Sequence, residues 1–448
     1  MNSILLGQAE AGPQSLLLSR ANRHGIVAGS TGTGKTVTLQ TLAKAFSDAG
    51  VPVFAADIKG DVSTIAKVAP TKFWDLYGTS GQTIRISVAD MGPMLFSCLL
   101  ELNEVQYGII NIMFELAKAD NKPLNTIADV SSLLRYINQN TCSISNRYGH
   151  VKASTVGTIQ RKLLILKTNQ TADLFGPTNF KLGDLIQRQG SAGVINILSS
   201  QRLIEDPQMY TIFLFWLLNE LFRQLPEVGD LEKPKLVFFF DEAHLLFRDA
   251  PKMFVSKVEQ IVRLIRSKGV GVYFVTQNPA DLPEQILAQL SNRIQHALRA
   301  YTPAEQKGLR AASQSFRPNP AFDTAEAIQQ LGIGEALVSV LDEQGVPSQV
   351  QKTKIGAVKI PAAPALNTVV SAPAINSSVN LDLMLPKNEG LKTFVVQETP
   401  KAPAKIIQVT KQRSSFGHFI KKCVSLAACV MVFWSLPIAV SFSFAFAG

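Results

Sequence analysis

A phosphate-binding signature near the start of the chain constrains its fold more than any other feature. The stretch reads Gly-Ser-Thr-Gly-Thr-Gly-Lys-Thr and matches the pattern G-x-x-x-x-G-K-[ST] in full. Its glycines permit a sharp turn in which successive N–H groups point inward at anionic oxygens. The candidate nucleotide-binding residues are Gly29, Ser30, Thr31, Gly32, Thr33, Gly34, Lys35 and Thr36.

The residues on either side of this loop agree with a nucleotide site. Residues 24–28 have the composition of a short buried strand, and apolar residues follow at helical spacing over 37–46. This pattern predicts strand, loop and helix, with the phosphates of ATP at the helix N-terminus. Lys35 would reach the β- and γ-phosphates, and the Thr36 hydroxyl would coordinate Mg²⁺.

The 448 residues, 46% hydrophobic and 17% charged, indicate a globular protein with an ample core. The four cysteines, at 98, 142, 423 and 429, have neither metal-ligand spacing nor the density of a disulfide framework. They suit a reducing compartment. The N-terminus lacks both a basic stretch and a long apolar run, so we expect no signal peptide and a cytoplasmic protein.

Strand-like and helix-like segments alternate over residues 1–350, which predicts an α/β domain with a parallel sheet. Residues from about 90 to 190 are mainly helical in pattern, as in 104–114 and 154–166, and predict a helical insertion between early and late strands. The further strands that we expect cover residues 51–57, 193–198, 236–241 and 271–277.

The composition changes after residue 350. Residues 351–415 are Pro/Ala-rich and predict an extended, disordered linker. From residue 351 onward eleven Lys/Arg face three acidic residues, so most of the net charge of +10 lies in this tail and the body is near neutral. Residues 416–448 carry an uncharged apolar run from 423 to 447 behind Lys421 and Lys422. We expect an apolar C-terminal helix that tethers the protein to the inner membrane, or else packs against protein.

Two carboxylates end a strongly apolar strand. Asp241 and Glu242 follow Phe238-Phe239-Phe240, and the ends of strands in open α/β sheets are where ligands bind. Asp241 would hold Mg²⁺, and Glu242 would orient and deprotonate the attacking water. The alternative is an acidic helix cap, but the phosphate-binding loop favours the catalytic interpretation.

Polar residues around the next strand are further candidates. Gln277 ends this strand, where its amide would contact the γ-phosphate or the attacking water, although a strand-terminating turn is the alternative. Arg266 lies in the preceding crossover, where basic residues often only compensate a helix dipole. A ring-forming ATPase needs an arginine that reaches a neighbour's γ-phosphate, so Arg266 is our first candidate and Arg293 the second.

The segment Asp57-Ile58-Lys59-Gly60-Asp61 follows another predicted strand. Its position at a strand end suggests a part in the site. A charged turn that opens a helix explains the same residues equally well, and the two interpretations stay open.

Together these motifs resemble the HerA-like ATPases of the HerA/FtsK superfamily, in particular the bacterial branch catalogued as DUF853 or YjgR-like proteins. The resemblance covers residues 1–350. It is carried by Asn22-Arg23-His24-Gly25, the phosphate-binding loop, the Asp57–Asp61 segment, Asp241 to Phe247, and Thr276 to Pro279.

The resemblance implies a RecA-like core, ATP hydrolysis, a homo-hexameric ring and movement of DNA. The family's catalytic positions match Lys35, Thr36, Asp241, Glu242 and Gln277, and a trans-acting arginine matches Arg266. HerA helicases carry a β-barrel domain before the ATPase, whereas here the loop begins near residue 29. This difference argues against docking of a partner nuclease.

Two functions therefore remain. The first is a hexameric motor, a helicase or translocase that moves DNA. The second is a membrane-associated ATPase that remodels or moves protein without nucleic acid. The near-neutral body slightly favours the second function, and the family resemblance favours the first more strongly.

Overall fold

The computed structural model describes residues 2–79, 81–168, 171–199, 207–248 and 252–359. The expected C-terminal apolar helix with its membrane anchor, and almost all of the expected linker, lie outside these residues. Among the described residues no helix has the length and apolar character needed to cross a bilayer.

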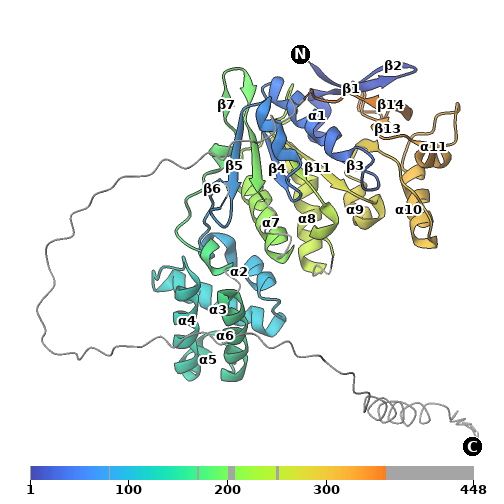
Figure 1. Cartoon of the computed structure of the whole chain (residues 1–448). Coiled ribbons are helices and arrows are strands. Elements are labelled where there is room, and N and C mark those ends of the chain that lie inside the picture. Colours follow the sequence, from blue (N-terminus) through green and yellow to red (C-terminus); the bar gives the residue numbers. More distant parts are fainter. Residues whose placement is uncertain (1, 80, 169–170, 200–206, 249–251, 360–448) are drawn as a thin grey trace, which may run out of the picture. The chain divides into compact units, whose positions relative to one another are not determined.

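A twelve-stranded mixed sheet forms the centre of the fold, in the order β2-β1-β14-β13-β12-β3-β11-β10-β4-β9-β5-β6 (Figure 1). The expected parallel sheet is confirmed for the strands from β12 to β6. These parallel strands are β3 (Gly25–Ala28), β4 (Val53–Asp57), β5 (Thr71–Asp75), β6 (Gln82–Thr83), β9 (Ile195–Ser199), β10 (Leu236–Phe240), β11 (Val270–Thr276) and β12 (Asn292–Gln295).

Four antiparallel strands extend one edge of the sheet, and the sequence analysis predicted none of them. They are β1 (Ser3–Ala9), β2 (Gly12–Leu17), β13 (Glu335–Ser339) and β14 (Gln351–Ile355). Strand β14 also corrects the predicted boundary at residue 350, because residues 351–355 belong to the sheet and not to a linker. In β14 the exposed Lys352 and Lys354 alternate with buried Thr353 and Ile355. With two lysines among five residues, this strand resembles a polar linker in composition.

Helices cover both faces of the parallel strands. They are α1 (Lys35–Asp48), α7 (Pro207–Gln224), α8 (Lys252–Ile265) and α9 (Glu284–Leu287), with α10 (Pro303–Gln314) and α11 (Thr324–Gln330) near β13. Successive residues of β10 enter two different cores: Phe238 packs with α7 and α8, whereas Phe239 packs with α1. Burial on both faces explains the unbroken apolar sequence of β10.

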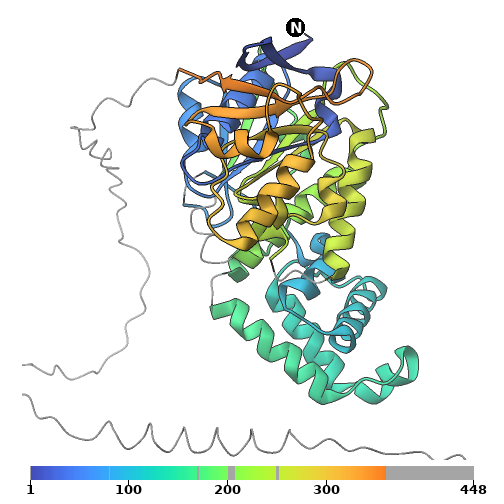
Figure 2. The same cartoon turned by 90° about the vertical axis from the view of Figure 1, so that its right-hand side faces the viewer.

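The helices between β6 and β9 agree with the expected insertion over 90–190. They are α2 (Val88–Leu99), α3 (Glu104–Ala119), α4 (Ile127–Gln139), α5 (Thr141–Tyr148) and α6 (Ala153–Thr168), and the short hairpin β7 (Arg188–Gln189) and β8 (Ala192–Gly193) follows them. Figure 1 and Figure 2 show α3 to α6 gathered into a group of helices at one end of the sheet. Their apolar side chains continue the core that packs on α7.

The buried imidazole of His24 joins β11 to α8. The Val272 N–H donates to His24 Nδ1 at 3.0 Å, so the other ring nitrogen, Nε2, carries the proton and donates to the Val262 carbonyl oxygen at 2.7 Å. Burial, together with the charges of Arg266 and Arg23, lowers the pKa of His24 to about 4. The neutral ring is therefore part of the folded structure.

This histidine makes stability depend on pH. Because the pKa of His24 is lower in the folded state than in the unfolded state, the unfolded chain takes up the proton first, and stability falls as the pH drops below about 6.5. We expect His24 to account for a loss of roughly 2 kcal/mol in unfolding free energy between about pH 6.5 and pH 5, as measured by urea unfolding. His24→Gln should be less stable at neutral pH but lose less on acidification. The matched control is His150→Gln, at an exposed position. An equal acid loss in His24→Gln and the unmodified chain would contradict this role.

Candidate functional site

The loop from Gly29 to Thr36 joins β3 to α1, as the motif predicts. Gly29, Gly32 and Gly34 have φ of +150°, +79° and +113°, values that side chains with a Cβ rarely adopt. Helix α1 begins at Lys35, directly after Gly34. The loop therefore leaves its N–H groups at a helix N-terminus, where the macrodipole favours an anion.

Backbone contacts from elements distant in sequence hold the loop. The Ser30 N–H donates to the Ala297 carbonyl oxygen at 2.8 Å, and the Gly334 N–H donates to the Thr33 carbonyl oxygen at 3.1 Å. The loop is thus fixed both by the segment after β12 and by the turn before β13.

His296 supports the loop from beneath. It is fully buried, its Nε2 lies 2.8 Å from Thr38 Oγ1, and its Nδ1 lies 2.9 Å from the Glu335 carbonyl oxygen. Burial lowers the pKa of His296 to about 4, so the ring is neutral. A Cβ on Gly29 would lie 2.6 Å from the His296 Cβ, which explains why a glycine stands there. No sequence motif singled out His296, although it directly follows β12, a strand that ends at the binding edge.

Lys35 lies folded onto its own loop. Its Nζ donates to the carbonyl oxygens of Gly29 at 2.5 Å and Ser30 at 2.9 Å. Burial lowers the pKa of Lys35, and the charges of Glu242 and Asp241 act in the opposite direction. The lysine therefore lies within electrostatic range of the two predicted carboxylates.

Asp241 and Glu242 follow β10 at the same edge of the sheet as the loop. Glu242 has a φ of +47°, a left-handed conformation that is uncommon outside glycine. Its N–H donates to Asp241 Oδ1 at 2.9 Å, and Tyr210 of α7 donates to the Asp241 carbonyl oxygen at 2.7 Å. These contacts fix the turn that carries both carboxylates.

Three side chains from different elements surround the Glu242 carboxylate. Lys59 forms an ion pair with Oε1, Gln277 Nε2 donates to Oε2 at 3.3 Å, and His244 Nδ1 lies 3.3 Å from Oε2. Burial acts to raise the pKa of Glu242, but these neighbours outweigh it and lower the pKa to about 2. The predicted pair of Glu242 and Gln277 is thus brought together in the structure.

Asp241 has the opposite electrostatic character. Burial and the nearby charge of Glu242 raise its pKa to about 7. Two carboxylates at one place are costly without a cation, and a divalent ion would offset their charge.

The Asp57–Asp61 segment is both a charged turn and a part of the site, the two interpretations that the sequence left open. Asp57 is a structural turn residue, because its carboxylate accepts hydrogen bonds from Gly60 N–H and Ser63 N–H, both at 2.8 Å. Lys59, in contrast, extends to Glu242. Its role was missed because the contact depends on β4 and β10 being neighbours in the sheet.

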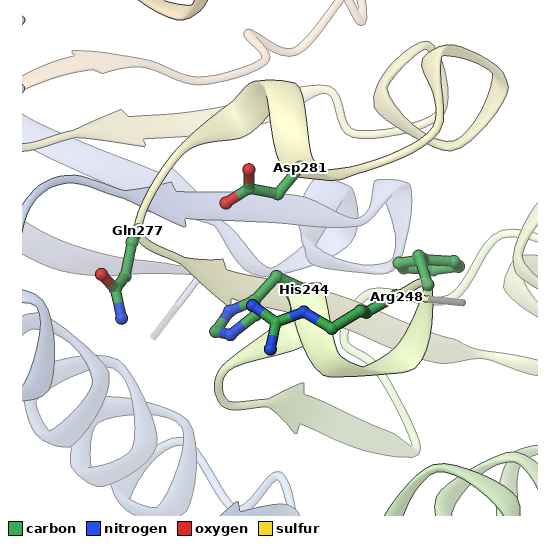
Figure 3. A pocket seen from close by; sticks show the side chains of 5 residues that line it. His244, Arg248, Gln277 and Asp281 are labelled. Atoms are coloured by element: carbon green, nitrogen blue, oxygen red, sulfur yellow. The ribbon is translucent and has the colours of Figure 1, made fainter. Parts of the chain in front are cut away.

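A polar cavity of about 350 Å³ is lined in part by His244 and Gln277, the two residues whose side chains lie beside Glu242 Oε2. Figure 3 shows His244 and Arg248, from the segment after β10, and Gln277 and Asp281, from the segment after β11. The cavity therefore gives water a place beside the amide of Gln277, one residue contact away from Glu242.

The two candidate arginines have different environments. Arg266 is exposed and precedes β11, whereas the phosphate-binding loop lies beside Thr276 at the other end of that strand, about 20 Å away by strand rise. Arg266 therefore does not serve the loop of its own chain. Arg293 is held by the carbonyl oxygens of Leu290 and Leu287, at 3.1 and 3.0 Å, in a structural role.

Comparison with known proteins gives a family match over most of the chain. The family described as "Helicase HerA-like C-terminal" matches residues 3–69 and 66–380. The DNA double-strand break repair helicase HerA of Saccharolobus solfataricus is 24% identical over 340 residues, 70% of this chain and 61% of the relative. The protein of that name from Sulfolobus acidocaldarius is 25% identical over 72% of this chain and 63% of the relative. The chain thus spans less than two thirds of these relatives.

Solved structures share the fold. VirB4 of Thermoanaerobacter pseudethanolicus superposes with a TM-score of 0.58 at 16% identity, over 80% of this chain and 97% of that protein. The bacterial conjugative coupling protein TrwB gives a TM-score of 0.56 at 13% identity, over 80% of this chain and 90% of that protein.

The contact between Gly29 and His296 predicts unequal effects of two glycine substitutions. Gly29→Ala combines a strained φ with the close Cβ contact, so we expect it to lower the unfolding free energy by about 2–5 kcal/mol. Gly32→Ala has open space around it and should cost only about 1–2 kcal/mol. Urea unfolding without nucleotide measures both. Equal losses would show that His296 does not support the loop.

Proposed function

Since this chain belongs to the helicase HerA-like C-terminal family, we propose that it is an ATP-hydrolysing motor of the HerA/FtsK superfamily that moves DNA through a ring of six copies. The observation that carries this proposal is the buried Glu242 carboxylate, beside Gln277 and within electrostatic range of the Lys35 ammonium. The names of the relatives, which are DNA repair helicases, support DNA as the substrate.

The phosphate-binding loop would hold ATP through its backbone N–H groups, with Lys35 on the β- and γ-phosphates. Mg²⁺ beside phosphates usually binds only one or two protein oxygens and fills its other positions with phosphate oxygens and water. Thr36 and Asp241 would supply these protein oxygens. The raised pKa of Asp241 fits a carboxylate that lacks a cation. Bound Mg²⁺ would neutralise phosphate charge. A solved structure of TrwB with ADP and Mg²⁺ supports the same ligands.

Glu242 would accept a proton from a water molecule whose oxygen attacks the γ-phosphorus, and the bond from that phosphorus to the bridging oxygen of ADP breaks. Gln277 would hold the carboxylate and the water in place. The adjoining polar cavity supports access of water to this point.

Arg266 would act on the neighbouring copy. Its exposure and its distance from the loop of its own chain support a role across a subunit interface, where a ring brings an arginine to another copy's γ-phosphate. The helical insertion and the sheet domain would together form one subunit of the ring, with residues beyond the sheet acting as a linker and a C-terminal anchor.

The ATPase rate of the full chain, measured with and without double-stranded DNA, distinguishes the proposed motor from its alternative. We expect DNA to stimulate hydrolysis several-fold, and Lys35→Ala and Glu242→Gln each to lower the stimulated rate by about 10²-fold or more. Glu104→Gln, at an exposed position in the insertion, is the control. A rate that ignores DNA but still requires Lys35 and Glu242 would replace the DNA motor by an ATPase that acts on protein at a membrane.

Mixtures of two variants test whether neighbouring copies share the site. Arg266→Ala should lower the ATPase rate by about 10³-fold. Mixing it with Lys35→Ala should restore part of the rate, because a mixed interface joins an intact loop to an intact arginine. The control mixture pairs Lys35→Ala with Arg263→Ala. Arg263 is an exposed arginine in the last turn of α8, three residues before Arg266, and Arg263→Ala should be active on its own. If the first mixture stays inactive, Arg266 does not act in trans.

A further inference from the structure

Lys59 connects the loop after β4 to the proposed base. Its ammonium forms an ion pair with Glu242 Oε1, although 43% of the Lys59 side chain is exposed and only 8% of the Glu242 side chain is. The carboxylate is thus fixed in the interior, and its cationic partner reaches it from the solvent side.

The backbone beneath Lys59 is held on both sides. The Asp57 carboxylate binds the N–H groups of Gly60 and Ser63, at 2.8 Å each. From α1, Gln40 Nε2 donates to the Asp61 carbonyl oxygen at 2.8 Å. Because these hydrogen bonds hold the backbone, the Lys59 ammonium can change its position by rotation of the side chain, without a change in the loop.

The charges around this side chain favour such a movement when a nucleotide binds. Burial and, to a smaller extent, repulsion by the Lys59 ammonium lower the pKa of Lys35, so the two lysines lie within electrostatic range of each other. A triphosphate in the loop would bring new negative charge next to Lys35 and offset that repulsion. Lys35 itself would turn from the carbonyl oxygens of its loop to the phosphates.

We propose that Lys59 is a positioning residue that holds Glu242 in a resting ion pair and moves its ammonium to the γ-phosphate when a nucleoside triphosphate binds. The inference rests on the proposed function, in which Glu242 is the base. Glu242 becomes free to accept a proton from water only when a γ-phosphate is present, so the ion pair breaks with ATP but not with ADP. A lysine that only stabilised the fold would affect binding of ATP and ADP equally.

The test compares binding of ADP and of ATPγS, a slowly hydrolysed analogue, to the full chain with Mg²⁺. We expect Lys59→Met to weaken ATPγS binding about tenfold and ADP binding less than twofold, since a charge-assisted contact to the γ-phosphate is lost. Lys59→Arg should retain most of the discrimination. Lys122→Met is the matched control, because Lys122 pairs with Asp120 in the helical insertion and its side chain is also 43% exposed.

A double-mutant cycle tests whether Glu242 competes for Lys59. Glu242→Gln should strengthen ATPγS binding several-fold more when Lys59 is present than when it is replaced in Lys59→Met. Only the chain with Lys59 has an ammonium that the loss of the Glu242 charge sets free to bind the γ-phosphate. Equal gains in both backgrounds, or equal weakening of ADP and ATPγS by Lys59→Met, would overturn the inference.

These outcomes separate the inference from the proposed function. If the unmodified chain binds both nucleotides and Lys35→Ala abolishes binding, but Lys59→Met leaves the ratio of affinities unchanged, the nucleotide site stands and the inference fails. If the unmodified chain binds neither nucleotide, both fail. Thermal unfolding of each variant shows whether a loss of binding reflects a loss of fold.

Discussion

Burial of the central strands on both faces is the constraint on which the rest of the structure depends. Phe238 and Phe239 of β10 enter opposite cores, and β11 is buried along its whole length. Such strands have no place for charged side chains, so polar residues collect where the strands end. The carboxylates, Gln277 and the phosphate-binding loop meet at one edge for this reason.

The charges at that edge are balanced only in part within the chain. Lys59 offsets Glu242 directly, whereas Lys35 bonds to carbonyl oxygens of its own loop and Asp241 keeps a raised pKa. The resting site is therefore electrostatically arranged for ligands that bring both negative phosphates and a cation. Coupled charges of this kind are characteristic of functional sites.

The sequence predicted what depends on local pattern. The strand, loop and helix around residue 35 and the carboxylates after β10 follow from signals within a few residues of each other. The Lys59–Glu242 contact and the support of the loop by His296 depend on strand order, in which β10 lies between β11 and β4 and β12 lies beside β3. The antiparallel edge was missed because a strand such as β14 has a single apolar residue, Ile355, so its alternation of exposed and buried positions leaves no hydrophobic pattern in the sequence.

The pairing of β1 with β14 has a consequence for how the protein is made. Gly7 lies opposite Ile355, so the first strand to leave the ribosome can pair fully only after the last described strand of the sheet has been made. At about 5–20 residues per second this wait lasts roughly 20–70 s. During that time the β1–β2 hairpin has an unpaired edge, a known hazard for aggregation. Pairing of β1 with β14 is thus a late step of sheet assembly, and the edge of β1 that β14 later covers stays open until then.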